Sequence, residues 1–175
     1  MMTRMALALI LIAAIATIGC SGGDTEGTDG TDGTDGTEVI LHPTWITPQL
    51  EGDTVSIPKS EVDSGKMLHF GVPYQDASMD FMAYKLGEEI YVRSTACPPC
   101  QSVGFDLQGD ILVCKGCGTL FEAETGEGIS GAGTCRDYPK AEAPYTIGGE
   151  KVTMGMDDLV TAYEETKEPI CPTCD

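Results

Sequence analysis

Two Cys-x-x-Cys pairs constrain this chain more than any other feature of its sequence. Cys97 and Cys100 form the first pair and Cys114 and Cys117 form the second, with residues 101–113 between them. A Cys-x-x-Cys turn lets both thiolates point at one metal, and two such turns supply a tetrahedral four-sulfur site. The spacing therefore predicts a metal centre. It does not distinguish zinc from an iron–sulfur cluster, because both accept four thiolates.

Disulfides are the alternative for these four cysteines. Cysteines outside the cytoplasm often pair with one another, and a cross-link such as Cys97 with Cys114 would suit the same spacing. Gly116 and Gly118 favour the metal interpretation, because a tight metal-binding loop needs positive φ or close backbone approach at such positions. A thioredoxin-like role is disfavoured, because residues 101–109 read as a loop rather than as the start of a helix.

Three further cysteines and two histidines are additional candidates for metal ligands. Cys135 follows a glycine-rich stretch and is interpreted as a fifth sulfur for the metal, with a free or disulfide-bonded thiol as the alternative. Cys171 and Cys174 form a third pair in the C-terminal tail, 171–175, and we expect a disulfide or accessory thiols there rather than ligands. His42 and His69 lie far from the pairs in sequence and are interpreted as packed or surface residues.

The first twenty residues predict a secretory signal with a lipid attachment site. Arg4 precedes an apolar run over 5–18, which is too short to cross a bilayer of roughly 30 Å and is typical of a signal peptide. Thr17-Ile18-Gly19-Cys20 resembles a lipobox, so Cys20 is the candidate for lipidation. A short uncleaved anchor is the alternative. Both interpretations place the protein on the extracytoplasmic face of the cell membrane.

Residues 21–38 predict a disordered acidic linker between this anchor and a folded domain. The segment repeats Thr-Asp-Gly and holds no large apolar residue, so it cannot bury enough surface to offset its backbone entropy. We therefore expect the folded domain to begin at residue 39 and to extend to residue 170.

The charge of the chain excludes one class of partner. The formal net charge is −18, and residues 39–175 hold nine basic and 22 acidic residues. Nucleic-acid binding requires basic surface, so we expect no nucleic-acid partner. The charge is typical of a soluble acidic domain and would also attract a cation or a basic protein.

From residue 39 onward the pattern predicts a mainly β fold with a single long helix near the C-terminus. Apolar residues alternate with polar ones in short runs that end at glycine, proline or aspartate. An apolar stripe at i, i+3, i+4 and i+7 predicts a helix over 156–167. We therefore expect a small β-sandwich or barrel-like domain with metal-binding loops. The predicted strands cover 39–41, 54–57, 67–72, 79–86, 90–94, 110–114, 119–121, 145–147 and 151–154, and residues 122–144 are predicted to form a long loop.

The order of several motifs over about residues 50–165 resembles the FtrD-like family of membrane iron–sulfur proteins. The second cysteine pair with its surroundings is also similar to the second half of a Rieske domain, with Cys117 where a Rieske centre has histidine. The motifs are Val-Ser-Ile-Pro (55–58), Leu-His-Phe (68–70), the two cysteine pairs, Gly-Phe (104–105), Phe121, Gly-Thr-Cys (133–135), Tyr145 and Gly-Gly (148–149).

The family resemblance implies an iron–sulfur cluster held by Cys97, Cys100, Cys114, Cys117 and Cys135. It also implies an extracytoplasmic electron-transfer or redox-accessory role beside an iron permease or another redox partner, rather than a stand-alone enzyme. The alternative is a structural zinc site, or disulfides, in a binding module without redox activity.

Overall fold

The computed structural model describes residues 39–131 and 133–170. The predictions of a signal peptide with its lipid site Cys20, of an acidic linker and of a paired-cysteine tail at Cys171 and Cys174 lie outside the described residues. Among the helices of the described ranges, none is long and apolar enough to cross a membrane.

The predicted fold class is confirmed, because strands dominate and the long helix α2 (Met156–Lys167) lies where its apolar stripe places it. A short helix, α1 (Lys59–Asp63), and a 3₁₀ turn, η1 (Cys135–Asp137), complete the helical elements of the described chain. The strands are β1 (Ile40–Leu41), β2 (Pro43–Trp45), β3 (Gln49–Glu51), β4 (Thr54–Pro58), β5 (Met67–Tyr74), β6 (Ala77–Leu86), β7 (Glu89–Ser94), β8 (Phe105–Gln108), β9 (Ile111–Cys114), β10 (Leu120–Glu122), β11 (Gly128–Ser130), β12 (Thr146–Gly148) and β13 (Lys151–Gly155).

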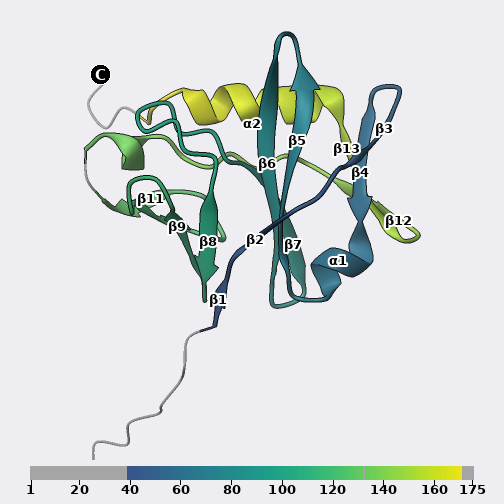
Figure 1. Cartoon of the computed structure of the whole chain (residues 1–175), viewed down its shortest axis with the longest axis horizontal. Coiled ribbons are helices and arrows are strands. Elements are labelled where there is room, and N and C mark those ends of the chain that lie inside the picture. Colours follow the sequence, from purple (N-terminus) through teal and green to yellow (C-terminus); the bar gives the residue numbers. More distant parts are fainter. Residues whose placement is uncertain (1–38, 132, 171–175) are drawn as a thin grey trace, which may run out of the picture. The chain divides into compact units, whose positions relative to one another are not determined.

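A central sheet in the order β2-β5-β6-β7 (Figure 1) packs against a hydrophobic core on each of its faces. Successive side chains of a strand point to opposite faces, so β5 sends Leu68 and Phe70 into one core and Met67 into another. Phe70 is paired with Phe81 of β6, and their rings stack at 5.8 Å. Each face of this sheet thus packs against a separate hydrophobic core.

The first core lies between the central sheet, a second sheet in the order β12-β13-β4-β3, and helix α2. The helix contributes Leu159 and Ala162 to this core, and Asp157 and Asp158 in its first turn favour its N-terminus through the helix dipole. This half of the domain holds no cysteine of the predicted site.

The second core joins the central sheet to a third sheet, in the order β1-β8-β9-β10-β11 (Figure 1, with β1 in blue and the other four strands in teal to green). Phe105, Leu112 and Phe121 come from its three middle strands and are fully buried, together with Cys114 at the end of β9. The second cysteine pair therefore begins at a residue buried in the hydrophobic core, and this burial fixes the position of its turn.

Three local predictions are wrong. Residues 101–109, predicted as a loop, contain β8, whose Phe-Asp-Leu-Gln alternation buries Phe105 and Leu107. The predicted long loop at 122–144 contains β11 and η1. The strand predicted over 145–147 is displaced by one residue, because β12 covers Thr146–Gly148 and Gly148 itself pairs with Lys151.

Candidate metal centre

Both cysteine pairs form tight turns closed by the same type of backbone hydrogen bond. In the first turn, the Gln101 N–H donates to the Cys97 carbonyl at 2.6 Å, and in the second the Gly118 N–H donates to the Cys114 carbonyl at 2.9 Å. Each donor residue directly follows the second cysteine of its pair. Both have a left-handed backbone conformation, with φ of 55° at Gln101 and 72° at Gly118. Glycine adopts this conformation without a steric cost, which explains its presence in the second turn.

The two turns are held against each other by backbone contacts. The Lys115 N–H, in the second turn, donates to the Gly104 carbonyl at 2.9 Å, just after the first turn. Gly116 lies so close to the first turn that a Cβ there would come within 2.6 Å of Ser102 Cβ and 3.8 Å of Cys100 Sγ. A side chain at this position would collide with Ser102, so the two turns could not keep their present contact.

All five cysteines predicted as metal ligands are brought together. Cys100, Cys114 and Cys117 have sulfur atoms within 4.8 Å of one another, and so do Cys97, Cys100 and Cys135. Cys100 belongs to both groups, and its Sγ lies 3.8 Å from that of Cys114. All five are free cysteines, so this arrangement is not the disulfide alternative. Cys97, Cys114 and Cys135 are buried, whereas Cys100 and Cys117 are half-buried at the edge of the site.

The crowding of the sulfurs perturbs their acidity in opposite directions. The pKa of Cys114 is lowered to about 4, first by a hydrogen bond from Cys97 and then by backbone N–H groups of its own turn. The pKa of Cys97 is raised, because its thiol donates to Cys114 and because it is buried. Burial also raises the pKa of Cys100 to about 11. Several buried thiolates can therefore coexist only if a cation lies among them.

The donor set fits an iron–sulfur cluster. Iron–sulfur clusters are held by cysteine thiolates, and five are present within two overlapping groups. The Thr119 hydroxyl lies 3.1 Å from Cys117 Sγ and is buried, so it is placed to donate to this sulfur. Neither histidine belongs to either sulfur group among the described residues: His42 is exposed and His69 is buried in the central sheet.

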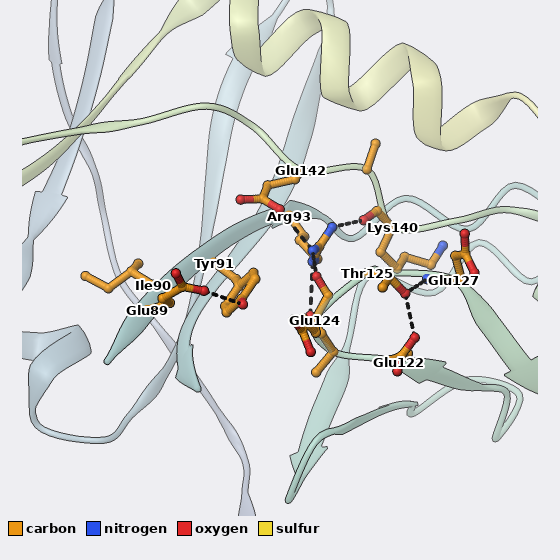
Figure 2. Close-up of polar contacts among 12 residues, drawn as sticks. Glu89, Ile90, Tyr91, Arg93, Glu122, Glu124, Thr125, Glu127, Lys140 and Glu142 are labelled. Carbon is orange, nitrogen blue, oxygen red and sulfur yellow. Dashed lines mark hydrogen bonds and ion pairs between the residues drawn. The ribbon is translucent and has the colours of Figure 1, made fainter. Parts of the chain in front are cut away.

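Two buried basic residues beside the site were not found from the sequence. Arg93, on β7, donates from Nη1 to the Lys140 carbonyl at 2.9 Å and from Nε to the Ala123 carbonyl at 3.2 Å. Its Nη2 donates to the Glu124 carbonyl and pairs with the Glu142 carboxylate at 3.0 Å (Figure 2). A single arginine in a β-strand carries no local signal of such a role, because its partners come from distant segments of the chain.

Lys140 is the second of these residues and lies nearer the sulfurs. It is fully buried, and its Nζ donates to the Ala96 carbonyl at 2.6 Å, one residue before Cys97. Burial lowers the pKa of Lys140, while the neighbouring sulfurs, Cys97 first, act in the opposite direction. The sequence shows only a lone lysine between Pro139 and Ala141 in a predicted loop.

Residues 62–167 match the family described as "Membrane iron-sulfur containing protein FtrD-like", which is more than half of the chain. No curated protein sequence matches. Among solved structures, the chain is similar to a complex of reduced oxygenase and oxidized ferredoxin in carbazole 1,9a-dioxygenase, at 18% identity over 61% of this chain and 95% of that one, with a TM-score of 0.48. It is also similar to a Sphingomonas yanoikuyae B1 ferredoxin, at 23% identity over 49% of this chain and 83% of that one, with a TM-score of 0.38.

Proposed function

Because the chain belongs to the family of FtrD-like membrane iron–sulfur proteins, we propose that it is an electron carrier whose five clustered cysteines hold an iron–sulfur cluster. When bound, such a cluster takes up and releases electrons at a potential that its charge, hydrogen bonds and solvent exposure determine. Cys97, Cys100, Cys114, Cys117 and Cys135 are the proposed ligands.

The observation that carries this proposal is the asymmetric burial of the sulfurs. Cys97, Cys114 and Cys135 anchor the site in the domain, and Cys100 and Cys117 bring it to the edge. A buried side protects a cluster from water, and a partly exposed side lets a redox partner approach it closely. On this geometry and on the family to which the chain belongs, we assign the domain to electron transfer rather than to stand-alone catalysis.

The proposed location is the extracytoplasmic face of the membrane, with Cys20 as the lipid attachment site. The family is one of membrane proteins, and an apolar run ending in a lipobox-like stretch supports the finer assignment. The acidic linker over 21–38 would hold the domain away from the lipid surface. The proposed partner is a membrane iron permease or another membrane-bound redox protein.

The cofactor is tested by purifying the full chain anaerobically and measuring iron, acid-labile sulfide and zinc. We expect brown protein that contains iron and sulfide, with visible bands that bleach on reduction and a paramagnetic resonance signal in one oxidation state. Colourless protein with one zinc per chain would reject the electron carrier in favour of a structural zinc site.

The location is tested separately, by fractionating cells that express the wild-type chain or the Cys20→Ala variant. We expect the wild-type chain in the membrane fraction, with the added mass of a lipid at Cys20. The variant should lack this added mass. An unmodified Cys20 in the mature wild-type protein would contradict the lipid anchor without bearing on the cluster.

A further inference from the structure

Lys140 is a lysine placed where lysines are rarely found. Its side chain is fully buried, with Nζ 4.8 Å from the centre of the Phe121 ring and 5.6 Å from that of Phe105. An ammonium group in such surroundings is costly unless opposite charge and hydrogen bonds compensate it. Ring faces and the Ala96 carbonyl provide part of that compensation, but neither carries a full negative charge.

The backbone of Lys140 is held on both sides by hydrogen bonds. The Lys140 N–H donates to the Gly126 carbonyl at 2.8 Å, and the Lys140 carbonyl accepts from Arg93 Nη1 at 2.9 Å. Gly126 permits this contact, because a Cβ there would lie 2.2 Å from the Lys140 oxygen. With its backbone held on both sides, the residue directs its long side chain into the domain toward the cysteine turns.

The ionisable groups nearest to the Lys140 ammonium are the sulfurs, which become negative when they hold a metal: its Nζ bonds the carbonyl next to Cys97, and the Phe105 and Phe121 rings beside it pack in the same core as Cys114. Cys97, Cys114, Cys100 and Cys135 are the groups whose charges favour its protonated form, in that order. In the described part of the chain, Lys140 forms no ion pair with a carboxylate, whereas Arg93 has Glu142 and the exposed Lys115 has Asp106. The four cysteines that balance the charge of this ammonium are thus all proposed cluster ligands.

We propose that Lys140 is the built-in counter-cation of the iron–sulfur centre and raises its reduction potential. Reduction adds one electron from an external donor and makes the centre more negative, with no bond formed or broken at Lys140. A positive charge in a water-poor site interacts more favourably with the more negative state. This inference rests on the proposed electron-transfer function and assigns a residue that controls its potential.

A second effect of Lys140 has to be separated from its charge. Its Nζ also holds the Ala96 carbonyl and so positions the first cysteine turn. Three substitutions distinguish the two effects: Lys140→Gln keeps a hydrogen-bond donor without charge, Lys140→Met keeps neither, and Lys140→Arg keeps both. If charge is responsible, the first two variants will behave alike and the third will behave like the wild type.

The test is a redox titration of the cluster-loaded full chain, followed by visible and paramagnetic resonance spectra. In both Lys140→Gln and Lys140→Met, we expect the ratio of reduced to oxidised protein at a fixed potential to fall at least tenfold, which is about 59 mV for a one-electron couple. Lys140→Arg should stay within a factor of about three. A reduction potential equal to that of the wild type in Lys140→Gln would overturn the proposal, because the charge of Lys140 would then have no effect on the potential.

Lys115→Met is the matched control, because it removes a lysine charge from within the second cysteine turn. Its side chain is 45% exposed and paired with Asp106, so solvent and salt screen its charge. We expect a smaller shift that shrinks as the salt concentration rises, whereas the shift in the Lys140 variants persists. Equal shifts with equal salt dependence would overturn the proposal.

Failure of the uncharged variants to retain a cluster is also informative. If Lys140→Gln and Lys140→Met lose iron to a chelator while Lys140→Arg retains it, the positive charge is required to hold the cluster, and the counter-cation role stands. Loss of iron from all three variants would assign Lys140 to packing instead and overturn it. A wild-type chain without any reversible redox couple would reject the proposed function itself, a result distinct from each of these.

Discussion

Arg93 and Lys140 are joined by a hydrogen bond of 2.9 Å from the guanidinium of one to the backbone carbonyl of the other (Figure 2). The first residue lies on β7 of the central sheet, and the second lies 47 positions later beside the cysteine turns. Since Lys140 in turn holds the carbonyl next to Cys97, this bond connects the central sheet to the metal centre.

Replacing Arg93 should therefore damage both the fold and the site. The Arg93→Met variant leaves the carbonyls of Glu124 and Lys140 without their donor inside the domain, whereas that of Ala123 still accepts from the Tyr84 hydroxyl, and we expect a loss of about 3–5 kcal/mol in the free energy of unfolding. Denaturant titration of the loaded protein measures it. Arg136→Met is the control, because that side chain is 58% exposed and its removal should change stability by under about 0.5 kcal/mol. Similar losses in both variants would contradict a special role for Arg93.

The sharing of Cys100 between the two sulfur groups predicts unequal effects of cysteine substitutions. Cys100→Ala removes a sulfur from both groups, and we expect bound iron to fall by more than about tenfold. Cys135→Ala affects one group alone and should leave more iron, with a changed visible spectrum. Iron and sulfide analysis compares them with Thr134→Ala, which alters an exposed neighbour that makes no capping hydrogen bond. Equal losses in the two cysteine variants would show that the shared position has no special importance.

The Thr119 hydroxyl, 3.1 Å from Cys117 Sγ, should raise the reduction potential. Hydrogen bonds to a ligating sulfur stabilise the more negative reduced state. The isosteric Thr119→Val variant should lower the potential by roughly 40 mV, which corresponds to a difference of about 1 kcal/mol between the oxidation states. Thr125→Val removes an exposed hydroxyl that bonds Glu122 and should leave the potential unchanged. An unchanged potential in Thr119→Val would show that the hydroxyl does not donate to the sulfur.

His69 predicts a pH dependence of stability that is independent of the metal centre. The side chain is fully buried against Trp45, neither ring nitrogen has a hydrogen-bond partner among the described residues, and burial lowers its pKa to about 4. The unfolded chain therefore takes up a proton as the pH falls through about 6.5, while the native state stays neutral down to about 4. The contribution to stability is complete above pH 6.5 and decreases by roughly 3 kcal/mol as the pH falls to 4.

Denaturant titrations between pH 4 and pH 7 test this dependence. The difference in the free energy of unfolding between the wild type and His69→Leu should grow in favour of the variant as the pH falls. His42→Leu removes the other histidine from an exposed position and serves as the control. Parallel pH profiles for the wild type and His69→Leu would contradict the prediction.

The parts of this fold that could be predicted from the sequence are those with a local physical signal. Helix α2 begins and ends as predicted, because an apolar stripe, acids in its first turn and Lys167 in its last all act within the helix itself. The longer strands are also found, because period-two burial is local. The prediction missed β8, since four residues between two glycine-containing turns carry too short an alternation to outweigh the turn signal.

For the metal centre, the sequence alone determined which atoms are available: two Cys-x-x-Cys turns and one further cysteine, in a spacing and a family context that indicate iron and sulfide. The tertiary structure decided how these sulfurs are grouped, with Cys100 shared, Cys135 brought beside Cys97 and a buried Lys140 beside them. The physical reason is the range of the interactions. A turn is set by a few neighbouring residues, whereas the environment of a buried charge depends on segments that meet only when the β-sheets have packed.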